Sequence, residues 1–209
     1  MTIMNFIRKN LGLPMKYGDP KLVKKYCKGK GLEIGGASHA AFHFNALNVD
    51  MAAHDNPDDV YYQEQMKLAG CVKKVDIIAK GDSIPLEDNS VDFVFSSHVI
   101  EHFYDPISAV NEWLRVVKPN KYVVLIVPHK ERTFDSERDC TTIEEFETRH
   151  NDYDKNMSYP DQHYSVWTTE TFLEFAKHFN FNVIAYQDIV VPRFNNSFGI
   201  VIKKSERKS

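Results

Sequence analysis

The stretch Gly31-Leu32-Glu33-Ile34-Gly35-Gly36-Ala37-Ser38 and the shorter stretch Asn48-Val49-Asp50-Met51 decide the fold. The first is typical of a buried strand followed by a glycine turn, and the second of a strand that ends in an acidic residue. Glycines lack a Cβ and tolerate positive φ, so the backbone of such a turn can approach a ligand closely. An acidic side chain at the end of the next strand can accept hydrogen bonds from both hydroxyls of a ribose. The unit can therefore hold an adenosine-containing cofactor, although a glycine turn after a strand is also often only a turn.

Strands and helices alternate along most of the chain. The sequence predicts strands over Gly31–Gly35, Ala46–Met51, Val75–Ala79, Ser90–Ser96, Tyr122–Val127, Phe181–Asp188 and Ser197–Lys203. It predicts helices over Pro20–Lys28, Val60–Ala69, Ile143–His150 and Thr168–Phe179, and one that Asp105-Pro106 opens and Pro119-Asn120 ends. This alternation indicates an α/β fold, with a seven-stranded, mostly parallel sheet and helices on both faces. No helix separates the last two strands, so we expect a C-terminal antiparallel hairpin.

The 209 residues fit a single domain spanning 1–209. Within it, residues 1–29 are expected to form an N-terminal helical cover. Residues 129–165 interrupt the alternation after the fifth strand and are rich in charged residues, Asn, Tyr and His. Long polar segments of this kind often cover active sites, so we expect a lid insertion here.

Composition excludes several classes of protein. The net charge is −3 and no basic face stands out, so nucleic acid is not an expected partner. No run of 18 apolar residues occurs, and the N-terminus lacks the apolar core of a signal peptide, so stable membrane insertion is not expected. The three cysteines are odd in number and far apart, which argues against a disulfide framework and favours a cytoplasmic location.

Four polar features follow predicted strands, at the edge of the sheet where open α/β proteins bind ligands. They are Glu33–Ala37, Asp50-Met51, Asp82-Ser83 and Ser96-Ser97-His98. The last of these runs into Val99-Ile100-Glu101-His102. Four such features at equivalent strand ends are hard to explain by packing alone, so we expect one ligand site along this edge.

With these residues in place, the chain resembles class I, Rossmann-like S-adenosylmethionine-dependent methyltransferases. The resemblance rests on Leu32–Ala37, Asn48–Asp50, Gly81–Asp92, Ser97–His102 and Trp113–Pro119. The segments Pro128–Asp135 and His163–Thr168 further resemble small bacterial methyltransferases of surface-polysaccharide loci. Two departures are Gly35-Gly36-Ala37 in the glycine motif and Asn120-Lys121 after Pro119, where the family usually has glycine. Asn tolerates the left-handed conformation, so that turn can survive.

The resemblance implies a role for each feature of the site. Glu33 and the backbone of Gly35, Gly36 and Ala37 would hold the methionine part of S-adenosylmethionine. Asp50 would bind the ribose and Met51 would lie on the adenine. Asp82 would accept from the adenine amino group, and the Ser83 N–H would donate to a ring nitrogen. Ser96, Ser97 and His98 would line the reactive end. The alternatives are core packing for Met51 and a turn cap for Asp82.

The segment His98-x-x-Glu101-His102 also matches the H-x-x-E-H pattern of inverted zinc peptidases. Here it follows a buried strand, and Asp105-Pro106 ends it within a few residues. No third ligand on another helix stands out. We therefore expect no metal site, and Glu101 and His102 can equally be structural.

The lid supplies the remaining catalytic candidates. His163 is the first choice for a general base, because it directly precedes the entry to a predicted helix. His98 and His102 are further candidates. Other polar side chains of the lid can bind substrate or simply face solvent: His129, His150, Asp161, Tyr159, Tyr164, Arg132 and Arg138.

The function that this resemblance implies is methyl transfer to a nitrogen or oxygen atom of a small polar metabolite. A sugar, an amino alcohol phosphate or an amino acid derivative would fit. One alternative is a non-catalytic relative that binds the cofactor and acts as a partner subunit. Another is a nicotinamide-dependent reductase, but Gly35–His39 lacks the glycine spacing for pyrophosphate. The oligomeric state is left open, with a homodimer among the options.

Overall fold

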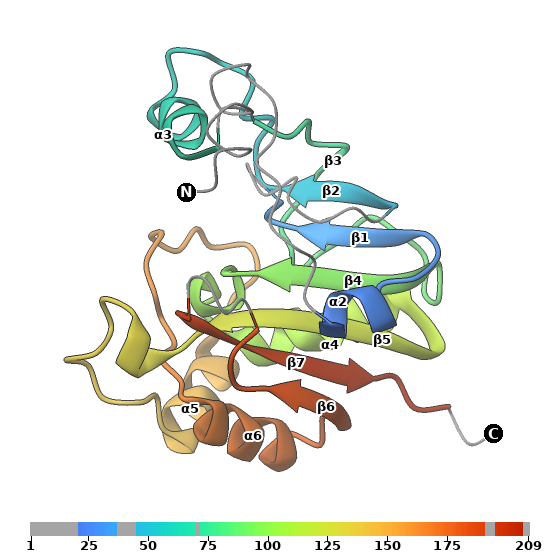
Figure 1. The fold of residues 1–209 in the computed structure, drawn as a ribbon, viewed down its shortest axis with the longest axis vertical. Helices are drawn as coiled ribbons and strands as arrows, with labels where there is room; N and C mark the ends of the chain where they lie inside the picture. Colours follow the sequence, from blue (N-terminus) through green and yellow to red (C-terminus); the bar gives the residue numbers. More distant parts are fainter. Residues whose placement is uncertain (1–20, 37–44, 70–71, 191–194, 207–209) are drawn as a thin grey trace.

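A computed structural model of the protein describes residues 21–36, 45–69, 72–190 and 195–206 (Figure 1). The strands are β1 (Gly31–Ile34), β2 (Ala46–Asp50), β3 (Ile77–Ile78), β4 (Val91–Ser97), β5 (Val117–Pro128), β6 (Val183–Gln187) and β7 (Ser197–Lys203). The helices are α2 (Lys21–Tyr26), α3 (Val60–Ala69), α4 (Pro106–Val116), α5 (Ile143–Asp152) and α6 (Thr169–His178). Two short 3₁₀ helices are η1 (Ile100–His102) and η2 (Lys130–Arg132). In the described ranges, no helix has the length and apolar character needed to cross a membrane.

The seven strands form one sheet in the order β3-β2-β1-β4-β5-β7-β6. The first five strands pair in parallel, and β7 is antiparallel to both of its neighbours. The predicted α/β fold, with a mostly parallel sheet and a C-terminal antiparallel pair, is therefore confirmed. The chain goes from β1 to β2 on one side and returns to β4 on the other. Such a change of direction opens a crevice at the carboxyl ends of the strands.

Apolar side chains cover the sheet on both faces. On one face, Val23 of α2 and Cys27, which follows that helix, pack with Phe93 and Phe95 of β4. On the other, α4 and α6 pack against the sheet, and Trp113 of α4 is fully buried there. β4 and β5 lie in the middle and read as near-continuous apolar runs, as expected for strands covered on both faces. In Figure 1, α3 lies beyond the β2–β3 end of the sheet.

Two elements differ from the sequence-based expectation. The third strand is only Ile77–Ile78, much shorter than the predicted Val75–Ala79. Pro119-Asn120 does not separate helix from strand, because α4 ends at Val116 and β5 begins at Val117. The four residues after Val117 instead loop out of register with β4, and Asn120 takes the left-handed conformation with φ of 62°. Asn at this position therefore does supply the turn conformation that glycine usually provides.

The segment 129–165 contains η2 and α5 and lies at the edge toward which the arrowheads of β1, β2 and β4 point (Figure 1). Its base is tied to the sheet side of the molecule. His129 forms a β-bridge with Trp167, and the N–H groups of Tyr164 and Ser165 both donate to the carbonyl of Glu101, at 2.7 and 3.2 Å. Phe146 of α5 is buried and stacks on Trp167. Of the expected N-terminal cover, α2 packs on the sheet, and residues 1–20 lie outside the described ranges.

Candidate functional site

The glycine turn after β1 is held by the neighbouring strand. Gly35 has φ of +62°, a conformation that glycine adopts without strain, and its N–H donates to the carbonyl of Val49 at 2.9 Å. The N–H of Gly36 donates to Oδ1 of Asn48 at 3.0 Å, and a Cβ on Gly36 would lie only 2.5 Å from that oxygen. Asn48 is fully buried and was not among the predicted site residues. The sequence did contain a signal for this role, because Asn48 is a polar residue in the middle of a buried strand. Ala37 lies outside the described residues.

Glu33 lies beneath this turn and is almost completely buried. Its carboxylate is paired with the ammonium group of Lys73, from the loop before β3. Burial raises the pKa of Glu33, and the charge and hydrogen bond of Lys73 oppose that rise. The predicted partner of Glu33 was the cofactor ammonium, whereas in this structure the carboxylate already has a cationic partner. A direct contact of Glu33 with the cofactor therefore stays a prediction.

Asp50 is the last residue of β2, and Met51 follows it. Oδ1 of Asp50 accepts from the N–H of Met51 at 2.7 Å and contacts Nε2 of His54 at 3.2 Å. The His54 ring lies against Tyr61 of α3, with centroids 4.1 Å apart. Met51 is 70% exposed, so the alternative of core packing is wrong for this side chain. An exposed thioether next to the carboxylate suits contact with a flat apolar ring.

Asp82 and Ser83 lie in the loop after β3, where the lid meets the cofactor edge. Tyr153, the residue that ends α5, donates its hydroxyl hydrogen bond to Oδ2 of Asp82, while Oδ1 is buried with no hydrogen-bond partner among the described residues. Burial and the Asp82 carboxylate together raise the pKa of Tyr153. The Ser83 N–H, predicted to bind adenine, donates to the carbonyl of Lys80 at 3.0 Å in this structure.

Ser96, Ser97 and His98 form the end of β4 and the residue after it. Ser96 is buried, and its hydroxyl has no hydrogen-bond partner among the described residues. His98 has φ of 55°, an uncommon conformation for a residue with a side chain, and its N–H donates to Ile126 at 2.9 Å. Such backbone strain often occurs at functional sites. Their role at the reactive end stays a prediction.

The three predicted catalytic histidines gather around one carboxylate. Oε1 of Glu101 lies 4.0 Å from Nδ1 of His98, 3.9 Å from Nε2 of His102 and 3.9 Å from Nε2 of His163. Glu101 is fully buried, and burial raises its pKa to about 8, with smaller contributions from Asp135 and Asp161. His163 therefore joins His102 and Glu101 from a distant part of the chain, and it lies in a loop and not on the second helix that the zinc-peptidase pattern requires.

The other lid candidates have structural partners. Nδ1 of His150 contacts Oδ2 of Asp105, which also caps the N-terminus of α4. His129 is buried, and its Nδ1 accepts from the N–H of Glu131. The remaining predicted side chains also have contacts in the structure: Arg132 with Asp188, Arg138 with Asp135, Tyr159 and Tyr164 with the Tyr104 ring, and Asp161 with His102. The structure thus concentrates the candidates on Glu101, His98, His102 and His163.

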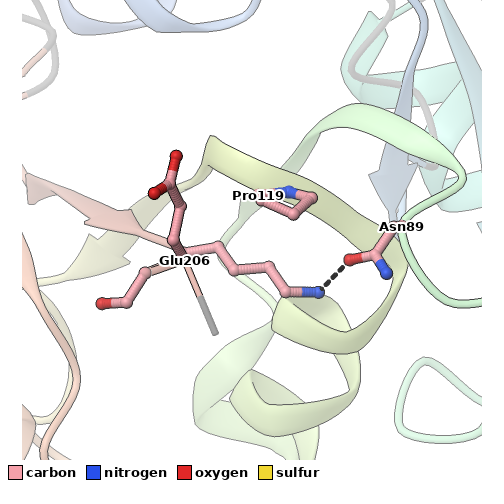
Figure 2. Close-up of a pocket in the computed structure, with 5 residues that line it drawn as sticks. Asn89, Pro119 and Glu206 are labelled. Carbon is pink, nitrogen blue, oxygen red and sulfur yellow. Dashed lines mark hydrogen bonds between the residues drawn. The ribbon is translucent and has the colours of Figure 1, made fainter. Parts of the chain in front are cut away.

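Figure 2 shows a hollow lined by Asn89, Pro119, Lys204, Ser205 and Glu206. It lies where β4 and β5 begin and β7 has ended, at the edge of the sheet opposite the carboxyl ends of the parallel strands. Lys204 Nζ donates to Asn89 Oδ1 across it at 2.7 Å, and also to the carbonyls of Arg115 and Val117. These contacts join the end of the chain to the start of β5, so we assign this hollow a structural role.

Residues 33–125 match a family described as a methyltransferase domain. Two uncharacterized methyltransferases of Mycobacterium sp. (strains KMS and MCS) are each 49% identical over 47 residues, which is 22% of this chain and 19% of theirs. The chain thus spans about a fifth of the length of these curated relatives.

Among solved structures, a SAM-dependent methyltransferase of Methanosarcina mazei has a TM-score of 0.55 at 16% identity, over 88% of this chain and 97% of that one. A SAM-dependent methyltransferase of Aquifex aeolicus has a TM-score of 0.52 at 21% identity, over 88% of each chain. This protein has the Rossmann-like fold of that class of enzyme. The expected enzyme class and cofactor agree with the family match and with these structures.

Proposed function

We propose that the protein is an S-adenosylmethionine-dependent methyltransferase acting on a nitrogen or oxygen atom of a small polar metabolite. The supporting observation is one edge of the sheet that carries both kinds of group such an enzyme needs. The glycine turn, Asp50 and Asp82 lie at the ends of adjacent strands, as adenosine recognition requires. The Glu101–histidine cluster lies at the end of β4, beside them.

The cofactor, when bound, supplies a methyl group on a sulfonium, which is already a good leaving group. The protein then has to position the acceptor and take its proton. As the acceptor atom bonds to the methyl carbon, the carbon–sulfur bond breaks and its electron pair stays on sulfur. We assign the acceptor's proton to an imidazole of the cluster, with His163, His98 and His102 as the candidates. His163 is oriented for this by Asp135, whose Oδ2 lies 2.6 Å from its Nδ1.

The surroundings of the cluster support the proposed class of acceptor. Tyr104 stacks on Tyr159, with ring centroids 4.3 Å apart and nearly parallel planes, and Tyr164 meets Tyr104 edge-on. Tyrosine rings with polar tips suit sugars and other small polar molecules. Sugars, amino alcohol phosphates and amino acid derivatives are therefore the compounds to screen. The motif resemblance of Pro128–Asp135 and His163–Thr168 extends the proposal to surface-polysaccharide synthesis in bacteria.

The proposal is tested first on the cofactor. S-adenosylhomocysteine should bind in calorimetry with chelator present, whereas NADH should not raise the melting temperature. Asp50→Ala should weaken that binding by about 3 kcal/mol, roughly 100-fold, because hydrogen bonds to a charged group are lost. Asp92→Asn is the matched control. Asp92 is the second residue of β4, at the opposite end of that strand from Ser97, and it pairs with Lys118 at 3.1 Å. Undiminished affinity of Asp50→Ala would sink the assignment.

Methyl transfer is then screened from S-adenosylmethionine to amines, amino alcohol phosphates and nucleotide sugars. Transfer to at least one compound supports the enzyme. A protein that binds the cofactor tightly and methylates none of these classes would instead fit the non-catalytic partner subunit.

A further inference from the structure

The side-chain carboxylate of Glu101 is buried and accepts no hydrogen bond from the described residues. This residue lies in η1, has no exposed surface, and neither of its side-chain oxygens has a hydrogen-bond partner among the described residues. Buried polar groups in proteins are normally hydrogen-bonded, because an unpaired buried carboxylate is costly. The backbone of this residue, in contrast, is well used, since its carbonyl accepts from Tyr164 and Ser165. The chain therefore holds an unsatisfied carboxylate firmly in place.

Two imidazoles face this carboxylate at a spacing too long for hydrogen bonds. Nε2 of His102 and Nε2 of His163 each lie 3.9 Å from Oε1 of Glu101. One ligand-type atom from each of the three residues can be chosen so that all lie within 4.8 Å of one another. Hydrogen bonds would bring these atoms to about 3 Å. A metal ion between the three side chains would account for a spacing that is too long for hydrogen bonds.

The far side of each imidazole is held by a second carboxylate. Nδ1 of His102 lies 2.7 Å from Asp161, and Nδ1 of His163 lies 2.6 Å from Asp135. Asp135 is itself buried and paired with Arg138 at 2.7 Å. A proton on each Nδ1 leaves the Nε2 lone pair facing Glu101. Carboxylate–histidine pairs of this kind orient metal ligands in proteins.

We propose that Glu101, His102 and His163 bind a divalent transition-metal ion, with Asp161 and Asp135 orienting the two histidines. Two imidazoles and one carboxylate suit Zn²⁺ and its first-row neighbours. Mg²⁺ and Ca²⁺ prefer all-oxygen surroundings and are expected to bind much more weakly.

A bound ion would also narrow the choice of the catalytic histidine. That assignment rests on the proposed function, whereas metal binding itself does not. Three protein ligands leave a coordination position for an oxygen or nitrogen of the acceptor. His102 and His163 then serve as ligands and not as bases. His98, whose Nδ1 lies 4.0 Å from Glu101, becomes the imidazole assigned to the acceptor's proton.

The test is a metal titration of the untagged, chelator-stripped full chain without cofactor or acceptor. Zn²⁺ is followed by calorimetry and elemental analysis, and Co²⁺ by its absorption spectrum. We expect one equivalent per chain, and Mg²⁺ in excess should not displace it. His102→Ala, His163→Ala and the near-isosteric Glu101→Gln should each weaken binding by more than about 100-fold. Asp135→Asn should weaken it by about 10-fold or more.

The matched control is His178→Ala. His178 is half-exposed and pairs with Glu147 of α5 at 2.8 Å, so it resembles His102 in having a carboxylate partner and lies outside the cluster. Circular dichroism melts identify variants that fail to fold, and Glu101→Gln keeps the test decisive where an alanine variant unfolds. Less than about a tenth of an equivalent bound by the wild type, or Zn²⁺ binding that Glu101→Gln and His163→Ala leave unchanged, overturns the site. Because the cofactor test runs in chelator, each proposal can fail without the other.

Discussion

The cofactor edge (residues 31–97) and the lid segment (residues 129–165) build their polar groups in different ways. At the cofactor edge the decisive contacts are to backbone groups of neighbouring strands, as when Asn48 receives the N–H of Gly36. In the lid they are side-chain pairs between residues far apart, as when His163 meets both Asp135 and Glu101. The family match ends at residue 125, before the lid begins. One half of the site thus follows from sheet geometry, and the other has to be assembled by the lid.

We expect the largest effect from removing the partner of a buried charge at the cofactor edge. This variant tests whether that charge depends on its partner as strongly as the buried charges of the lid do. Lys73→Met leaves the Glu33 carboxylate buried without its cation, which should lower the free energy of unfolding by about 3 kcal/mol at pH 8. Without Lys73, the pKa of Glu33 rises further above its unfolded value. The folded state then holds a proton that the unfolded state releases, so stability falls as pH rises.

Urea melts at pH 8 and pH 5 check this prediction. The deficit of Lys73→Met should shrink at pH 5, where Glu33 can take a proton. Glu33→Gln/Lys73→Met should recover much of the loss at pH 8, because no charge is left to bury. An equal deficit at both pH values, unrelieved in the double variant, would show that Lys73 contributes by packing and not by charge.

An effect of intermediate size is expected at the contact between the lid segment and the cofactor edge. Tyr153→Phe removes the hydrogen bond by which the lid occupies Asp82. If adenine takes the same carboxylate, the variant should bind S-adenosylhomocysteine more tightly by about 1 kcal/mol, roughly fivefold. Tyr159→Phe is the control, since the Tyr159 hydroxyl accepts from the backbone N–H of Asp154, whereas it is the Tyr153 hydroxyl that donates to Asp82. Calorimetry showing weaker binding by Tyr153→Phe would mean that the hydroxyl supports the cofactor site.

The smallest effect on stability is expected from Phe134→Ala in the lid. Phe134 is 79% exposed, although its ring lies 4.7 Å from that of His163. Removing an exposed side chain should change the unfolding free energy by less than about 0.5 kcal/mol. Its position beside the cluster predicts instead a severalfold rise in the acceptor KM with little change in cofactor affinity. A variant with an unchanged KM would place the acceptor elsewhere in the crevice.

The sheet could be predicted from the sequence, and the polar residues at its strand ends could be located, because each signal there is local to one strand. Glu33 lies within β1, Asp50 ends β2 and Asp82 follows β3, and parallel strands bring their ends together. The partners of those residues could not be predicted from the sequence, since Lys73 lies 40 residues from Glu33 and Tyr153 lies 71 residues from Asp82. The histidine–carboxylate cluster could be predicted from the sequence only in part. Glu101 and His102 stood in one motif, but only the folded lid brings His163 to them.

The two N–H groups that meet the carbonyl of Glu101 have a consequence for how the lid can vary between related proteins. They fix the end of the segment at Tyr164 and Ser165, while the bridge of His129 to Trp167 fixes its beginning. An insertion or deletion at either point would shift His163 away from Glu101. The stretch from 154 to 160 lies between α5 and these anchors, and Lys80 contacts it through the carbonyls of Lys155 and Met157. Length changes in that stretch can alter which acceptor fits and leave the histidine–carboxylate cluster intact.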